Sequence, residues 1–100
     1  MSGIAKPQQV EKFKEFLENL ECVNNTCGQV EIIPRDRPDF IWGKRVLQIP
    51  LPWDDTFEFR DLIVSQAQNW ARKRNLYTNG YIHYLSEPLL LLTLKYNTPQ

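Results

Sequence analysis

Cys22, Cys27 and His83 are the residues of this chain whose types suit zinc binding or redox chemistry. Cys22 and Cys27 are separated by the four residues Val-Asn-Asn-Thr, a spacing found between paired zinc ligands. Zinc sites of this kind need a second pair of ligands, and the sequence has two cysteines and one histidine in total. We therefore expect two reduced cysteines near a helix end, with no metal and no cofactor. A disulfide or redox switch is the alternative.

Acid–base catalysis needs a titratable side chain with a partner within hydrogen-bond reach. The candidates are His83, within a predicted strand, and the neighbouring carboxylates Asp54 and Asp55. A lone histidine in a strand is usually structural. Asp55 and Glu58 have the spacing of a helix capping box, which explains the two carboxylates without catalysis. The sequence therefore predicts no catalytic residue and no enzyme.

A second group of residues, which are basic, suits nucleic-acid binding. Arginine and lysine can bind phosphates, and nearby tryptophan or tyrosine rings can stack on bases. Cations at a helix C-terminus are also expected from the helix dipole alone. The 12 basic and 12 acidic residues cancel, which further lowers the expectation of nucleic-acid binding. This alternative function would use Arg35, Arg37, Arg45, Arg72, Lys73 and Arg74.

Aromatic and leucine side chains outside the predicted helix faces suit contact with another protein. Protein interfaces are enriched in aromatic residues and arginine at their centres. The competing interpretation is that these rings fill the rim of the core. The predicted contact residues, beside a mobile 34–39 loop, are Trp42, Trp53, Tyr81, Tyr84, Leu90 and Leu92.

Two amphipathic helices would position these residues. The first is predicted from Pro7 to near Glu21, because apolar side chains recur at spacings of three and four. The second is predicted to begin after Asp55 as its N-cap and to end in the basic cluster. Asn75 would follow it in the left-handed conformation.

Four strands complete the prediction, at residues 29–33, 45–49, 81–85 and 89–96. Asn79-Gly80 would open the last hairpin. The leucines at 89–92 show no alternation, which predicts a strand covered on both faces, or covered on one and used in an interface on the other. A short helix is the alternative there.

The predicted fold is α+β in the order α-β-β-α-β-β, with about four antiparallel strands and two helices packed on one face. Its 100 residues suit one domain spanning 1–100, with flexible tails at 1–6 and 97–100. No apolar run is long enough to cross a membrane, and no signal peptide is evident, so we expect a cytoplasmic protein. With zero net charge, self-association or a protein partner is expected. The leading functional prediction is a non-enzymatic binding or regulatory module, acting as a homodimer or an adaptor.

Overall fold

The computed structural model describes residues 6–33, 46–84 and 86–96. Within them the helices are α1 (Pro7–Glu18), α2 (Glu21–Thr26) and α3 (Thr56–Arg72). The strands are β1 (Glu31–Ile33), β2 (Val46–Pro50), β3 (Leu76–Tyr84) and β4 (Pro88–Tyr96). All pairings are antiparallel, and the order across the sheet is β1-β2-β4-β3. The predicted α+β fold with a four-stranded antiparallel sheet is confirmed, and the element order matches apart from the additional helix α2.

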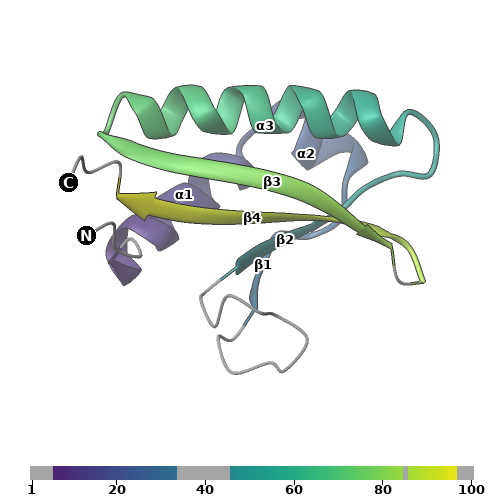
Figure 1. Cartoon of the computed structure of the whole chain (residues 1–100). Helices are drawn as coiled ribbons and strands as arrows, with labels where there is room; N and C mark the ends of the chain where they lie inside the picture. Colours follow the sequence, from purple (N-terminus) through teal and green to yellow (C-terminus); the bar gives the residue numbers. More distant parts are fainter. Residues whose placement is uncertain (1–5, 34–45, 85, 97–100) are drawn as a thin grey trace.

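The helices pack on one face of the sheet, as predicted (Figure 1). Alternate residues of the central strands point towards them and are fully buried, among them Leu47 and Ile49 of β2. Fully or nearly fully buried residues of the helices complete this core. From α1 and α3 they include Val10, Phe13, Leu17, Ile63 and Ala67. Within the described segments, none of the helices is both long and apolar enough to cross a lipid bilayer.

The first predicted helix is in fact two helices. α1 ends at Glu18, and the Asn19 side-chain Nδ2 donates to the Glu15 carbonyl at 2.9 Å. Leu20 then adopts an extended conformation with ψ 131°, and α2 starts at Glu21. An asparagine amide competes with the backbone for hydrogen bonds, which favours a helix end at this point. Cys22 is the second residue of α2 and Cys27 is its C-cap, so both cysteines lie near the ends of a helix, as predicted.

The Asn79-Gly80 pair does not open a hairpin, so this part of the prediction is wrong. β3 begins at Leu76, and both residues lie in its interior. Gly80 pairs with Leu92 on β4. A Cβ atom at Gly80 would lie 2.7 Å from Leu92 Cδ2 and 3.0 Å from Val64 Cγ2. Gly80 therefore allows α3 to approach β3 closely, which is a known role of glycine inside a strand.

The leucine run at 89–92 lies on β4, a central strand of the sheet. Leu90 and Leu92 are buried against the helices, and Leu89 and Leu91 are buried on the opposite face. Leu91 forms a small second cluster there with Val46. The prediction of a strand covered on both faces is therefore confirmed, and the short-helix alternative is wrong.

Candidate interaction site

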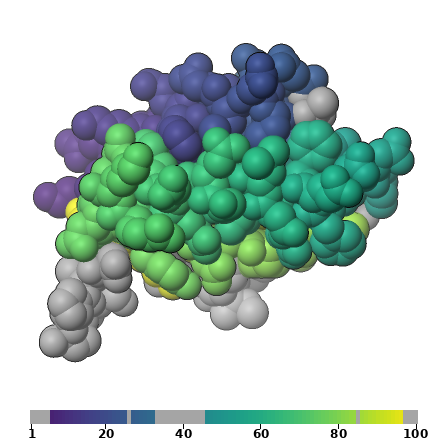
Figure 2. Space-filling view, turned by 90° about the horizontal axis from the view of Figure 1, so that it is seen from above, coloured from purple at the N-terminus to yellow at the C-terminus, as the bar shows by residue number. Residues whose placement is uncertain are grey.

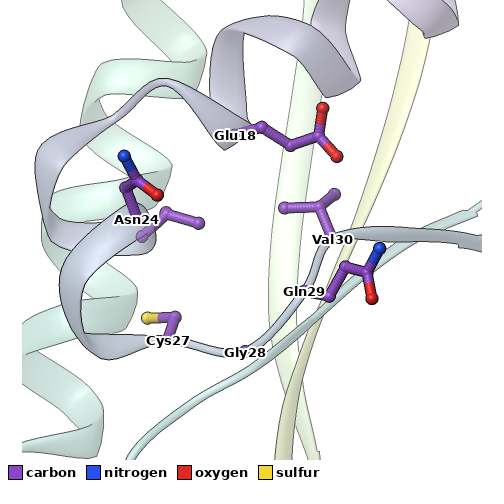
Figure 3. Close-up of a pocket in the computed structure, with 7 residues that line it drawn as sticks. Glu18, Asn24, Cys27, Gly28, Gln29 and Val30 are labelled. Atoms are coloured by element: carbon purple, nitrogen blue, oxygen red, sulfur yellow. The ribbon is translucent and has the colours of Figure 1, made fainter.

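One surface hollow lies where the end of α1, helix α2 and the segment before β1 meet (Figure 3). The residues that line it are Glu18, Val23, Asn24, Cys27, Gly28, Gln29 and Val30. In Figure 3 the Cys27 thiol and the Glu18 carboxylate lie at opposite ends of the hollow. The carboxylate is instead paired with Lys14, with 2.9 Å between Oε2 and Nζ. Since proton transfer needs groups within hydrogen-bond reach, Glu18 and Cys27 do not form an acid–base pair.

Cys22 and Cys27 are half-buried and are not joined in a disulfide. Burial raises the pKa of the Cys22 thiol above its ordinary value. Reactive cysteines have a lowered pKa, because the thiolate is the nucleophile and the metal ligand. In the part of the chain that the structure describes, no group of three or more His, Cys, Asp or Glu side chains could hold a metal ion.

Three exposed aromatic side chains gather at one end of the molecule: Trp53, Phe57 and Tyr84. We call these three residues the aromatic patch. They come from the turn before α3, the first turn of α3 and the end of β3. Together they line a hollow of about 350 Å³, and their exposed fractions are 66%, 57% and 54%. The structure thus brings together Trp53 and Tyr84, two of the contact residues predicted from the sequence.

A tight turn before α3 positions the patch. Asp55 adopts the left-handed conformation with φ 60°, and its side chain makes no capping hydrogen bond, so the predicted capping box with Glu58 is wrong. The single hydroxyl proton of Thr56 is instead shared between the carbonyl oxygens of Pro52 and Trp53, which lie 2.7 and 2.9 Å from Oγ1. Aspartate is among the residues that tolerate the left-handed region. The turn holds Trp53 beside the start of α3.

The border of the patch is acidic. Asp55 and Glu58 line the same hollow as the three rings. The Arg60 guanidinium lies 5.3 Å from the centre of the Phe57 ring, and its Nε is 2.9 Å from Asp61 Oδ1. Arg60 is therefore already paired with a carboxylate, and the two acidic residues give the hollow a negative character. Such a surface complements a partner that presents an apolar side chain with basic neighbours.

The basic cluster lies at the other end of α3. Arg72, Lys73 and Arg74 are all exposed. The 17 residues of α3 span about 25 Å, so the cluster is far from the aromatic patch. The Arg74 guanidinium lies 4.1 Å from the Trp70 ring centre, and its Nη1 donates to the Trp70 carbonyl at 3.0 Å. Arg74 thus stabilises the helix end, and the structure does not combine these cations with the patch rings.

The other predicted contact residues lie elsewhere. Tyr81 is exposed on the sheet face opposite the helices, where it pairs with Leu91 of β4. Leu90 and Leu92 have no exposed surface, because they pack beneath the helices, so the structure places them in the core instead of a contact surface. Outside the described residues lie Trp42, Arg35, Arg37, Arg45, the 34–39 loop and most of the two predicted tails.

Phe57 is not among the contact residues predicted from the sequence. This residue lies off the apolar stripe that predicts the buried face of α3, and more than half of its surface is exposed. Its position on the polar side of an amphipathic helix is the feature of the sequence that could have identified it as a contact residue.

Comparisons with models of protein families, with curated proteins and with solved structures found no match to this chain.

Proposed function

We propose that this chain is a non-enzymatic binding or regulatory module of the cytoplasm that acts through protein–protein contacts, as a homodimer or as an adaptor. The observation that carries the proposal is the aromatic patch. Three large rings from separate segments meet at the surface with more than half of each side chain exposed. Clustered exposed apolar surface marks interaction sites in soluble proteins, whereas single exposed apolar residues do not.

The patch suits a partner of defined chemistry. Rings of tryptophan, phenylalanine and tyrosine provide large, rigid contact areas at low entropic cost. The carboxylates of Asp55 and Glu58 beside them favour a segment with arginine or lysine. We therefore propose a peptide segment with an apolar anchor flanked by basic residues as the occupant.

Two further observations support binding over catalysis. The Cys27 thiol and the Glu18 carboxylate lie at opposite ends of the hollow in Figure 3. The Glu18 carboxylate forms an ion pair with Lys14. Burial raises the pKa of Cys22, which keeps this thiol protonated at neutral pH.

The proposal can be tested by selecting a displayed library of random peptides on the wild-type chain. Recovered peptides are then titrated against wild type and the variants Trp53→Ala and Tyr84→Ala. We expect a consensus with an apolar residue flanked by arginine or lysine, and at least about tenfold weaker binding to either variant, as for the larger hot-spot truncations. Tyr77→Ala is the matched control, because Tyr77 is also about half exposed but lies on the opposite sheet face. Selected peptides that bind the Trp53→Ala chain as tightly as wild type would overturn the proposal.

Nucleic-acid binding remains the second candidate, supported by the exposure of Arg72 and Lys73 at the end of α3. It predicts binding to single- or double-stranded probes whose affinity falls steeply with salt. The double variant Arg72→Glu/Lys73→Glu would abolish such binding. No salt-sensitive shift with either kind of probe would remove this candidate.

A further inference from the structure

The hollow of the aromatic patch combines three rings with two negative charges. None of the described residues that line it is basic, and two of them are carboxylates. Its volume of about 350 Å³ lies within the range of small-ligand sites, about 300–1,000 Å³. A cation is therefore the ligand whose charge complements this hollow. The lining residues are Trp53, Asp55, Thr56, Phe57, Glu58 and Tyr84.

Positive charges elsewhere on α3 leave this negative character in place. Arg60 is paired with Asp61 and lines a different hollow, together with Gly80 of β3. The N-terminus of α3 adds about half a positive charge, which is less than the two negative charges of Asp55 and Glu58. Figure 2 shows α3 crossing the molecule, with its start (teal) at one end and its last turn (green) at the other. The basic cluster at that far end is about 25 Å away, well beyond the Debye length of about 8 Å at physiological salt.

The ring faces of the patch are available to such a cation. The two ring stacks in the described part of the chain, of Phe13 and Phe16 on Trp70, involve none of the three patch rings. Phe57 already has the Arg60 guanidinium 5.3 Å from its ring centre, but Arg60 does not line the hollow, so the side of Phe57 towards the hollow is open. Aromatic rings attract cations to their faces, and tryptophan does so most strongly. The hollow therefore offers three cation-binding rings from three separate segments.

We infer that the aromatic patch binds the trimethylated side chain of a lysine in a partner protein. A trimethylammonium group is a rounded cation without N–H donors, so it can contact several rings at once. An unmodified ammonium group is strongly hydrated, and an arginine guanidinium is flat and stacks on one ring face. The methyl and methylene groups of trimethyllysine also provide the apolar surface of an anchor. This inference rests on the proposed function, because it names the anchor of the proposed peptide segment.

Two other occupants fit the hollow less well. A neutral apolar anchor would cover the carboxylates of Asp55 and Glu58 without giving either a partner, and removing an unpaired carboxylate from water is costly. A free quaternary ammonium compound such as choline has the right charge, but small molecules usually bind where most of their surface is buried. The three rings are more than half exposed, so an isolated cation would remain largely in water. A peptide adds contacts on either side of its anchor.

Versions of one labelled heptapeptide, Gly-Arg-Ala-Xaa-Ala-Arg-Gly, test the inference by fluorescence anisotropy with the wild-type chain. Xaa is trimethyllysine, unmodified lysine, arginine, or a neutral isostere in which a tert-butyl group replaces the trimethylammonium group. The trimethyllysine peptide should bind at least about tenfold more tightly than each of the others, because it alone combines a rounded apolar surface with a positive charge. Equal binding of the isostere would mean that the rings recognise an apolar anchor without its charge, and equal binding of lysine or arginine that methylation is not recognised. Either result would overturn the inference.

Variants of the chain assign this preference for trimethyllysine over the isostere to the hollow. Tyr84→Leu keeps an apolar side chain without the ring and should lower the preference at least about threefold, whereas Tyr84→Phe should retain it. Asp55→Asn, in which asparagine also tolerates the left-handed backbone, and Glu58→Gln should each lower it by about threefold. Glu11→Gln, at an exposed position on α1, is the matched control and should leave it unchanged. Circular dichroism confirms that each variant remains folded, and a preference unaffected by Tyr84→Leu would contradict the inference.

The result can be separated from that of the proposed function. If selected library peptides depend on Trp53 but trimethylation brings no gain, the trimethyllysine anchor is wrong and the binding module stands. If the trimethyllysine peptide binds as expected but the library gives no peptide that depends on Trp53, the inference stands and the unmodified apolar anchor is wrong. If free choline displaces the labelled peptide as effectively as unlabelled trimethyllysine peptide does, the site recognises a small quaternary ammonium ligand and the assignment to a partner protein is wrong.

Discussion

Substituting Gly80 with alanine tests how closely α3 and β3 approach one another. The added methyl group would lie 2.7 Å from Leu92 Cδ2, 3.0 Å from Val64 Cγ2 and 3.3 Å from Leu90 Cδ1. Leu90 and Leu92 have no exposed surface, so their terminal methyl groups cannot move into solvent. Val64 is β-branched and restricted at χ1. The neighbours can therefore make room only by distorting their rotamers or by moving the helix.

The expected magnitude combines two opposing effects. Overpacking a well-packed core costs about 1–3 kcal/mol. Alanine in place of glycine recovers about 0.5–1 kcal/mol, because the unfolded chain has less conformational freedom to lose. Taking the middle of each range, we expect Gly80→Ala to lower the free energy of unfolding by about 1 kcal/mol.

Urea unfolding followed by circular dichroism measures this change. The variant Val64→Ala removes one of the close methyl groups. In its presence the cost of Gly80→Ala should fall by about 0.5–1 kcal/mol, since residues in contact are energetically coupled. If Gly80→Ala is as stable as its parent, or if its cost is unchanged beside Val64→Ala, the described packing of α3 on β3 is incorrect.

Three further predictions concern stability and reactivity. Thr78→Val removes the buried hydroxyl that donates to the Thr93 carbonyl at 2.6 Å, and should cost about 1 kcal/mol in urea unfolding. Arg74→Ala removes the guanidinium stacked on Trp70 and should also cost about 1 kcal/mol, with an unchanged midpoint counting against the contact. Since burial raises the pKa of Cys22, its alkylation in a Cys27→Ser background should be slower in the folded chain than in urea at neutral pH. The same raised pKa stabilises the fold fully below the unfolded thiol's pKa, and this contribution is lost as pH rises through the folded pKa.

The parts of the fold that could be predicted from the sequence are those that determine the spacing of apolar residues along a single helix or strand. The apolar spacing of α1 and α3 reflects their buried faces, and Val10, Phe13 and Ile63 are indeed buried. The unbroken leucine run reflects the central position of β4. Burial on one or both sides of an element leaves a periodicity in the sequence, because each position has a fixed direction relative to the core.

The parts that were missed depend on contacts between distant residues. An Asn-Gly pair is a strong local signal for a hairpin, yet Asn79-Gly80 is held in β3 by its pairing with β4 and by the approach of Val64. The aromatic patch has the same origin. Trp53 and Tyr84 meet only because β3 runs back along α3, which brings the end of β3 beside the start of α3. No local pattern encodes that meeting.

Substitutions in the aromatic patch should affect binding without affecting the stability of the fold. More than half of each side chain is in water, and none of the three belongs to the buried core. Truncating Trp53 would leave no internal cavity, so Trp53→Ala should change the free energy of unfolding by no more than about 0.5 kcal/mol. Removing a buried side chain of α3 such as Ile63 would cost several times as much. A large ring that contributes little to the stability of the fold, beside two others and an acidic border, supports the proposed contact with a partner.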